Sequence, residues 1–206
     1  MAEAANDTRA DIAALRAELA ALRSEQAASA RKLRELSDRQ DIFRIVNTYT
    51  RGVDRHDVEI MRSVFHADAM DNHGDFLGDV DAFIEWVNTG HSAVCEAHMH
   101  NVTTHTCEID GDTAHAESYV IVILRPKDGE PVRISGGRYL DRLERRDGEW
   151  RIALRKVVME WRARIDGGPW IGNRRGYPGG RWDRQDMSYQ RPLQLDEMPA
   201  KARANG

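Results

Sequence analysis

The chain has 206 residues, of which 41% are hydrophobic and 31% charged, and its formal net charge is −4. This length fits one domain with extensions at its ends, and it is enough for a sizeable core. The weak negative charge gives no electrostatic reason to expect nucleic acid or an anionic membrane as a partner. No run of 18 apolar residues is present, so we expect no transmembrane helix.

Two further features indicate the compartment. The N-terminus lacks the basic and apolar regions of a signal peptide. Cys95 and Cys107 are too few for a disulfide framework and do not have the spacing of a zinc pair. We therefore expect a cytoplasmic protein in which both cysteines are buried thiols.

Residues 10–37 contain neither Gly nor Pro and predict a long helix. Its apolar residues follow the alternating steps of three and four that are typical of a coiled coil, with polar residues in the middle: Ile12, Leu15, Leu19, Leu22, Gln26, Ser29, Leu33 and Leu36. Such a stripe can pack on its own domain or on a neighbouring subunit. The seam is narrow and lies outside the compact region, which favours packing on a neighbouring subunit. We therefore expect a homo-oligomer, a dimer or trimer, in which residues 1–36 form an N-terminal helical extension.

Three shorter helices are predicted next. Ser37 or Asp38 can cap a helix that ends near Gly52. A second helix is predicted over residues 57–66, with Asp57 at its N-cap, and a third over 79–90, closed by Gly90.

The following segment predicts strands. Asp-Gly pairs at 110–111, 128–129 and 147–148 separate runs rich in Val, Ile, Tyr and Thr, a strong hairpin signal. They predict an antiparallel meander of strands 98–109, 114–125, 131–145 and 149–161, bent by a bulge at Gly136-Gly137. The expected fold class is α+β: residues 37–162 form a cone-shaped barrel in which three helices pack on a curved antiparallel sheet of four or more strands.

Residues 163–206 are rich in Gly and Pro but also carry Trp170, Tyr177, Trp182 and Tyr189. Free linkers seldom carry so many aromatic residues, so we expect an aromatic-rich C-terminal tail that is ordered over a pocket or a neighbouring subunit. The last seven residues, AKARANG, are expected to be disordered.

The stretch HMHNVTTH, residues 98–105, contains the candidate chemistry. Strand alternation places His98 and His100 on one face and His105 on the other. One hypothesis is a metal site in which His98 and His100 are joined by Asp54, Asp71 or His73. The other is proton transfer, in which a carboxylate orients an imidazole base.

Asp54 is the candidate carboxylate for proton transfer. It lies in RGVDRHD, at a helix end, and could instead cap the next helix. Asp57 is better placed for that cap, which leaves Asp54 free to face the sheet. We favour proton transfer and expect neither a metal nor a cofactor.

Four segments carry a family resemblance: YTRGVDRHD, DNHGDFLG, HNVTTHTCEIDGDTAHAESY and SGGRYLDRLERRDGEWRIALRKVV. In this order they resemble the SnoaL-like branch of the nuclear transport factor 2-like superfamily, over about residues 37–162. The resemblance implies a cone of three helices wrapped by a curved sheet. The superfamily includes dehydratases, a dehydrochlorinase, polyketide cyclases and ketosteroid isomerase-like enzymes, several of them cofactor-free.

The resemblance also implies roles. Asp54 matches an Asp at the end of the first helix that pairs with a strand histidine, matched by His100. Thr104 stands where the family often has Asn, and Tyr49 stands where the dehydrochlorinase has lysine. Halide elimination is therefore disfavoured, and Tyr49 suits a hydrogen bond to a hydroxyl or carbonyl oxygen. His98 is then expected to donate a hydrogen bond from the wall of the pocket, and His105 to have a structural rather than a catalytic role.

Developing negative charge needs further donors, for which Arg138 and Arg142 are candidates besides Tyr49 and His98. Either arginine can equally be an exposed strand residue in a salt bridge. Trp86 and Tyr119 either line an aromatic-binding pocket or belong to the core.

The first functional hypothesis is a cofactor-independent lyase for a neutral aromatic or polyketide-like small molecule. It would act by dehydration or by a retro-aldol step such as formaldehyde release, with isomerisation or cyclisation in the same pocket as alternatives. The second hypothesis is a non-catalytic binding or assembly module, and the third a metal-dependent enzyme. A small subunit of a ring-hydroxylating dioxygenase would need a partner, because no iron–sulfur motif is present.

Overall fold

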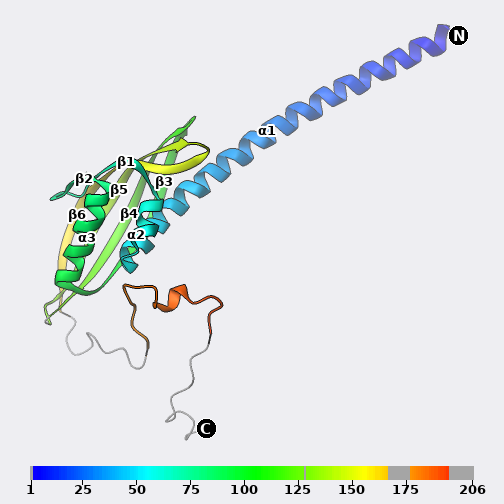
Figure 1. Cartoon of the computed structure of the whole chain (residues 1–206). Helices are drawn as coiled ribbons and strands as arrows, with labels where there is room; N and C mark the ends of the chain where they lie inside the picture. Colours follow the sequence, from blue (N-terminus) through cyan, green and yellow to red (C-terminus); the bar gives the residue numbers. More distant parts are fainter. Residues whose placement is uncertain (1, 128, 167–176, 195–206) are drawn as a thin grey trace, which may run out of the picture.

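The structure is a computed structural model that describes residues 2–127, 129–166 and 177–194, with side chains from residue 12 onward. Its elements are α1 (Ala2–Arg55), α2 (Val58–Ser63), β1 (Phe65–Asn72), β2 (Leu77–Asp79), α3 (Val80–Val94), β3 (Cys95–Asp110), β4 (Thr113–Pro126), β5 (Val132–Arg146), β6 (Glu149–Ile165) and the short 3-10 helix η2 (Met187–Tyr189). The helices lie on one face of a curved sheet (Figure 1). The predicted α+β class is confirmed.

Helix α1 is continuous, so the prediction of a new helix at Ser37 or Asp38 is wrong. No Gly or Pro interrupts the chain there. The carboxylate of Asp38 does not cap a helix but accepts hydrogen bonds from Nε1 of Trp150, at 2.9 Å, and from Arg145, at 2.7 Å. These contacts join the middle of α1 to the end of the sheet.

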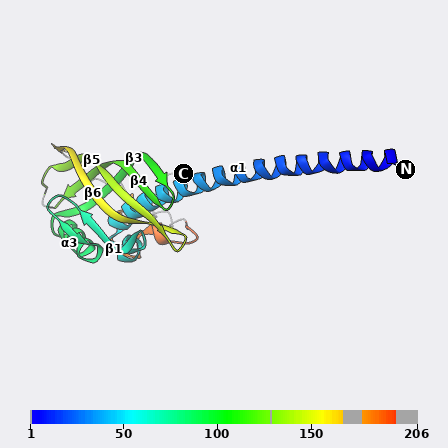
Figure 2. The ribbon, with the colours of Figure 1, turned by 90° about the horizontal axis from the view of Figure 1, so that it is seen from above.

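The exposed part of α1 extends far from the domain, as Figures 1 and 2 show from two directions. All six apolar residues of its predicted seam are exposed, by 44% to 69%: Ile12, Leu15, Leu19, Leu22, Leu33 and Leu36. The alternative that this stripe packs on its own domain is therefore wrong. Among the described residues, no helix combines the length and apolar character needed to cross a membrane.

The two short helices begin where predicted and end elsewhere. Asp57 caps α2 and Asp79 caps α3, each by accepting a backbone N–H three residues ahead. Helix α2 ends at Ser63, and the next residues join β1. Helix α3 continues through Gly90, so the predicted closure there is wrong; glycine in a helix interior costs only about 1 kcal/mol relative to alanine.

The sheet has the strand order β2-β1-β6-β5-β4-β3. The four predicted strands are confirmed; β3, β4 and β6 are longer than predicted, and β5 is shifted by one residue. Strands β1 and β2 were not predicted. Strand β1 pairs with β6 in parallel, so the sheet is mixed.

Several one-residue irregularities reverse the alternation of side chains along a strand, and two of them affect the site. In the predicted bulge, Gly137 pairs with Met159 but Gly136 pairs with Trp161, which leaves Glu160 as the extra residue of β6. In β3, Val102 pairs with Val120 and Thr104 with Tyr119, which makes Thr103 an extra residue. This second bulge was not predicted.

The core lies between the helices and the sheet face that they cover, called here the inner face. Its fully buried side chains come from all three helices and the strands, and include Ile42, Val46, Tyr49, Val53, Met61, Phe83, Tyr139, Leu143 and Ile152. Beneath Tyr49 and Tyr139, the buried Arg155 binds the carboxylate of buried Asp141 through two hydrogen bonds of 2.7 Å. Cys95 is a buried free thiol as predicted, whereas Cys107 is only half-buried.

Candidate active site

Asp54, in the last turn of α1, faces two histidines of β3. The Nδ1 atoms of His100 and His98 lie 2.7 Å and 3.1 Å from Oδ1 of Asp54. The backbone N–H of His100 donates to Oδ2 at 3.0 Å. A carboxylate can only accept, so each neutral ring donates Nδ1–H and keeps a lone pair on Nε2. The structure thus brings together the residues of the predicted pair, with His98 as a second partner of the same carboxylate.

Asp54 is held in its ionised form. Burial alone would raise the pKa of this carboxyl, but the hydrogen bonds from His100 and His98 outweigh it and lower the pKa to about 2. Its side chain is 14% exposed. Asp54 is therefore a fixed negative charge at neutral pH, positioned to stabilise a positive charge on His100.

A third histidine extends this chain of hydrogen bonds. Nε2 of His56 lies 2.9 Å from Nε2 of His98 and donates to it, because the His98 atom carries the lone pair. Burial and the neighbouring His98 lower the pKa of His56 to about 4, so it is neutral at pH 7. Its backbone has φ +51, a left-handed conformation that a non-glycine residue adopts only at a cost.

His91 of α3 completes a group of four histidines. Its ring lies 4.2 Å from that of His98, centroid to centroid. Burial and the surrounding imidazoles lower its pKa to about 3. Its buried Nδ1 has no hydrogen-bond partner among the described residues. Sequence reasoning missed both added histidines: His56 lies two residues after Asp54 in the quoted motif, whereas no signal distinguished His91.

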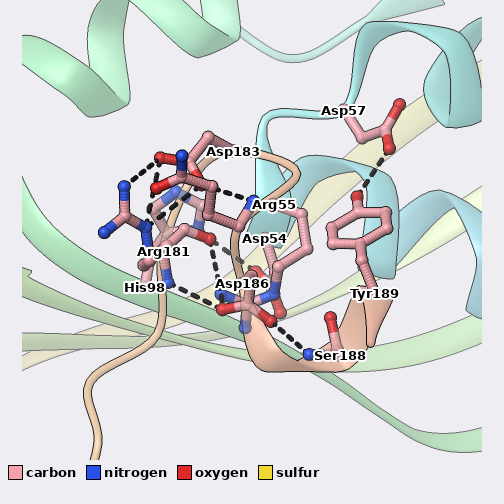
Figure 3. Close-up of polar contacts among 10 residues, drawn as sticks. Asp54, Arg55, Asp57, His98, Arg181, Asp183, Asp186, Ser188 and Tyr189 are labelled. Atoms are coloured by element: carbon pink, nitrogen blue, oxygen red, sulfur yellow. Dashed lines mark hydrogen bonds and ion pairs between the residues drawn. The ribbon is translucent and has the colours of Figure 1, made fainter. Parts of the chain in front are cut away.

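The C-terminal tail covers this group in its own chain. Figure 3 shows residues 181–189 passing over Asp54 and His98. Asp186 accepts the backbone N–H of Arg181 at 2.7 Å and pairs with Arg55, and the hydroxyl of Tyr189 donates to Asp57 at 2.5 Å. Residues of the predicted tail within 177–194 thus contact the domain, whereas Trp170 and the last seven residues lie outside the described residues.

Trp182 is the tail residue nearest the histidines. Its ring stacks on His56 at 4.2 Å with an interplanar angle of 9°, and lies 5.2 Å from His98. It therefore shields the hydrogen bond between those two rings from solvent.

A cavity of about 880 Å³ opens on the inner face between the sheet and α3. His100 lines it, as do the predicted Tyr49 and Trp86 and the unpredicted His73 and Tyr139. Burial raises the pKa of Tyr49 well above its ordinary value, so its phenol is a hydrogen-bond donor at neutral pH. The guanidinium of Arg155 lies 3.9 Å from the centre of its ring.

Residues 34–156 match the family model of the SnoaL-like domain. The chain belongs to the SnoaL-like family. This family lies within the nuclear transport factor 2-like superfamily, and the match leaves the exposed part of α1 and the tail outside it. No curated protein matches the chain.

Solved structures share the fold of this SnoaL-like protein. A scytalone dehydratase, described as putative, from Novosphingobium aromaticivorans DSM 12444 is 20% identical, with a TM-score of 0.58 over 63% of this chain and 88% of that one. A hexachlorocyclohexane dehydrochlorinase from Novosphingobium barchaimii LL02 is 20% identical, with a TM-score of 0.62 over 66% and 95%. An aromatic ring hydroxylase of N. aromaticivorans, also described as putative, is 25% identical, with a TM-score of 0.56 over 63% and 94%.

Four predicted substrate-binding residues of the SnoaL-like domain do not line the cavity. His98, predicted to be a donor at the pocket wall, is buried between Asp54 and His56. The other three are Tyr119, Arg138 and Arg142. Tyr119 and Arg138 are paired across β4 and β5, and the Arg138 guanidinium binds Glu117 and Glu160. Arg142 pairs with Glu144 and lines a separate depression on the outer face of the sheet. Their neighbour Tyr139 occupies the inner face, so the alternation turns all three outward.

The prediction that His105 faces away from His100 is wrong. Its ring packs 5.3 Å from Phe43 of α1, and its Nδ1 hydrogen-bonds to buried Ser118 at 2.8 Å. The extra residue Thr103 restores His105 to the inner face and turns Thr104 outward, where it is exposed. Thr104 therefore does not support His100 directly.

Two groups in the described residues offer ligand atoms for a metal: His56, His91 and His98, and Asp54, His98 and His100. In each group the atoms lie within 4.8 Å of one another. The predicted additional ligands Asp71 and His73 instead hydrogen-bond to each other at 2.7 Å. In the first group the ring centroids of His91 and His98 are only 4.2 Å apart. A metal bound in the plane of both rings would hold them further apart, which disfavours joint coordination.

Proposed function

We propose that this SnoaL-like protein is a cofactor-independent lyase that acts on a small aromatic or polyketide-like molecule in the 880 Å³ cavity. The observation that carries the proposal is the 2.7 Å hydrogen bond from His100 to Asp54, with His100 lining the cavity. A purely structural ion pair would not need an imidazole at the wall of a cavity.

In the proposed reaction, Nε2 of His100 takes a proton from the substrate. Asp54 holds the ring in the required tautomer and stabilises the imidazolium that forms. General base catalysis contributes about 10²–10⁴-fold, so negative charge on the substrate must also be stabilised. Tyr49 is the proposed donor for this, because its phenol stays protonated and lines the cavity.

The same base permits two outcomes. Removal of a C–H proton beta to a hydroxyl forms a C=C bond as the hydroxyl leaves and is protonated to water. Removal of an O–H proton from a β-hydroxy system forms a carbonyl, breaks the neighbouring C–C bond and leaves a carbanion. The carbanion is protonated or, where the adjacent carbon carries a hydroxyl, expels it to form a C=C bond as the hydroxide is protonated to water. The second outcome includes release of formaldehyde.

The comparisons support elimination chemistry without fixing the substrate. A dehydratase and a dehydrochlorinase, as two of the similar structures are described, both eliminate a group from their substrates. Their likeness to this chain shows the fold, so the reaction itself rests on the Asp54–His100 geometry.

The test is ultraviolet absorbance against time with a panel of aryl diols, β-hydroxy ketones and diarylpropanoids. Dehydration extends conjugation and raises the absorbance at long wavelength, and so does formaldehyde release from a diarylpropanoid diol whose carbanion expels the second hydroxyl. His100→Ala and Asp54→Asn should each abolish the change, whereas His115→Ala, an exposed histidine of β4, should retain it.

Equal rates for wild type and a folded His100→Ala variant would refute the role of His100. Consumption of a substrate without a change of mass, measured by mass spectrometry, would assign an isomerase or cyclase instead. Release of formaldehyde would distinguish C–C cleavage from loss of water.

A second candidate function, as a binding or assembly module, is favoured by the exposed seam of α1. Its six apolar residues are exposed in the single chain, and they repeat with coiled-coil spacing. We propose that α1 joins copies of this chain into a homo-oligomer. An inactive protein that still assembles through α1 would favour the module over the lyase.

A further inference from the structure

The arginines of β5 and β6 fall into two groups. These strands contain nine arginines. Six form ion pairs with carboxylates: Arg138, Arg142, Arg145, Arg146, Arg151 and Arg155. The other three are Arg133, Arg162 and Arg164, which form no ion pair with any carboxylate of the described residues and all line the cavity.

The three unpaired arginines lie close together on the inner face. Arg133 is directly opposite Arg164 across the two strands, and Arg162 is opposite Ser135 in the adjacent row. Like charges directly opposite each other destabilise a sheet. No counterion compensates for this arrangement in the described residues, so the cluster has a cost that a bound anion would remove.

The cavity offers little negative charge of its own. Asp75 is the single carboxylate among its described lining residues, and it forms no ion pair with the three arginines. The wall between the arginines and His100 is largely apolar, with Val120, Val122 and Leu124 from β4 and Val157 from β6. The site therefore combines an apolar middle with a strongly cationic end.

The strand register gives the distance between the two ends. His100, Val122, Ser135 and Arg162 form one row across four strands, and His98, Leu124, Arg133 and Arg164 form the next. Neighbouring strands are about 4.8 Å apart, so the arginines lie roughly 10–14 Å from the histidines along the sheet. This span matches an aromatic body of about two rings.

We propose that Arg133, Arg162 and Arg164 bind the carboxylate of the substrate, so that the ligand of this cavity is an aromatic acid of about two rings. Guanidinium groups suit a carboxylate because they bind it through paired hydrogen bonds. The assignment of the reacting end to His100 rests on the proposed function, whereas the recognition of the anion rests on the arginines. It replaces the neutral substrate predicted from the sequence.

The experiment compares two probes of equal shape, 4-phenylbenzoate and its uncharged amide, 4-phenylbenzamide. Their binding to the full chain is measured by titration calorimetry. We expect the carboxylate to bind about tenfold more tightly at low salt, as expected for one or more charge-assisted hydrogen bonds, with a smaller preference at high salt. The Arg133→Gln/Arg164→Gln double variant should lose the preference, and Arg142→Gln, on the outer face, should keep it.

Equal affinity for the two probes would overturn the proposal. So would a preference that the double variant retains, and so would the absence of binding of either probe at millimolar concentration. His100→Ala should leave the preference intact, which separates recognition from chemistry. A carboxylate preference without turnover of any panel compound would contradict the lyase and leave the anion site standing. Turnover of neutral diols that depends on His100, without a carboxylate preference, would support the lyase and contradict the anion site.

Discussion

Replacing Asp54 with asparagine tests the electrostatics of the site without requiring a known substrate. The carboxyl has a pKa of about 2 in the folded chain and an ordinary value of 3.8. A group whose pKa is lowered on folding contributes stability above its ordinary pKa and loses it as the pH falls through the folded value. The neutral amide of the variant resembles the protonated carboxyl, so at pH 7 Asp54→Asn should be less stable than wild type by about 2–3 kcal/mol.

The same linkage predicts a dependence on pH. At pH 3, between the two pKa values, the difference in free energy of unfolding between wild type and Asp54→Asn should fall to about half of its value at pH 7. The measurement is urea denaturation of both proteins at pH 7 and pH 3, followed by circular dichroism. Asp68→Asn is the control, because that exposed carboxylate only pairs with Arg146, and its effect should be much smaller. A difference that is the same at both pH values would refute the assignment of the stabilisation to the charge of Asp54.

Three other outcomes are expected. Gly136→Ala should lower the free energy of unfolding by about 1–3 kcal/mol in urea denaturation, because the added Cβ would overlap the indole of Trp161. Gly90→Ala should raise it by about 0.5–1 kcal/mol in the same measurement, because its Cβ meets nothing within 4 Å. Tyr189→Phe removes the hydrogen bond to the cap of α2 and should make the tail more susceptible to limited proteolysis, whereas Tyr177→Phe should not. Leu15→Glu/Leu19→Glu should reduce the mass measured by analytical ultracentrifugation to that of a monomer, and an unchanged mass would exclude α1 as the interface.

The elements that could be predicted from sequence are those with local causes. The Asp-Gly turns and β-branched runs predict β3 to β6, and the cap Asp57 predicts the start of α2. The continuity of α1 could not be predicted at Asp38, because its partners Trp150 and Arg145 are more than 100 residues away. Strand β1 lacks a turn signal, and its parallel pairing with β6 is a tertiary contact.

The residues of the site likewise divide into those with local sequence signals and those placed by tertiary contacts. Asp54, His98 and His100 were identified because strand alternation fixes which histidines share a face, and the resemblance indicated the carboxylate. Alternation also grouped Arg138 with Arg142 correctly, but a period of two does not say which face is inner. That choice depends on Tyr139 packing against α1, which the sequence of β5 alone does not reveal.

The two bulges decide which residues the cavity receives. With regular alternation beyond Met159, the inner face of β6 would carry Trp161 and then Ala163, which would fill the cavity end with an indole and an apolar wall. The extra residue Glu160 turns Trp161 outward, over Gly136, and brings Arg162 and Arg164 inward. Deleting Glu160 would remove the bulge together with its extra residue, so Trp161 should stay opposite Gly136 while Arg162 and Arg164 stay on the inner face. A folded deletion variant should therefore keep its preference for 4-phenylbenzoate, and a lost preference would refute the placement of these arginines by their register with β5.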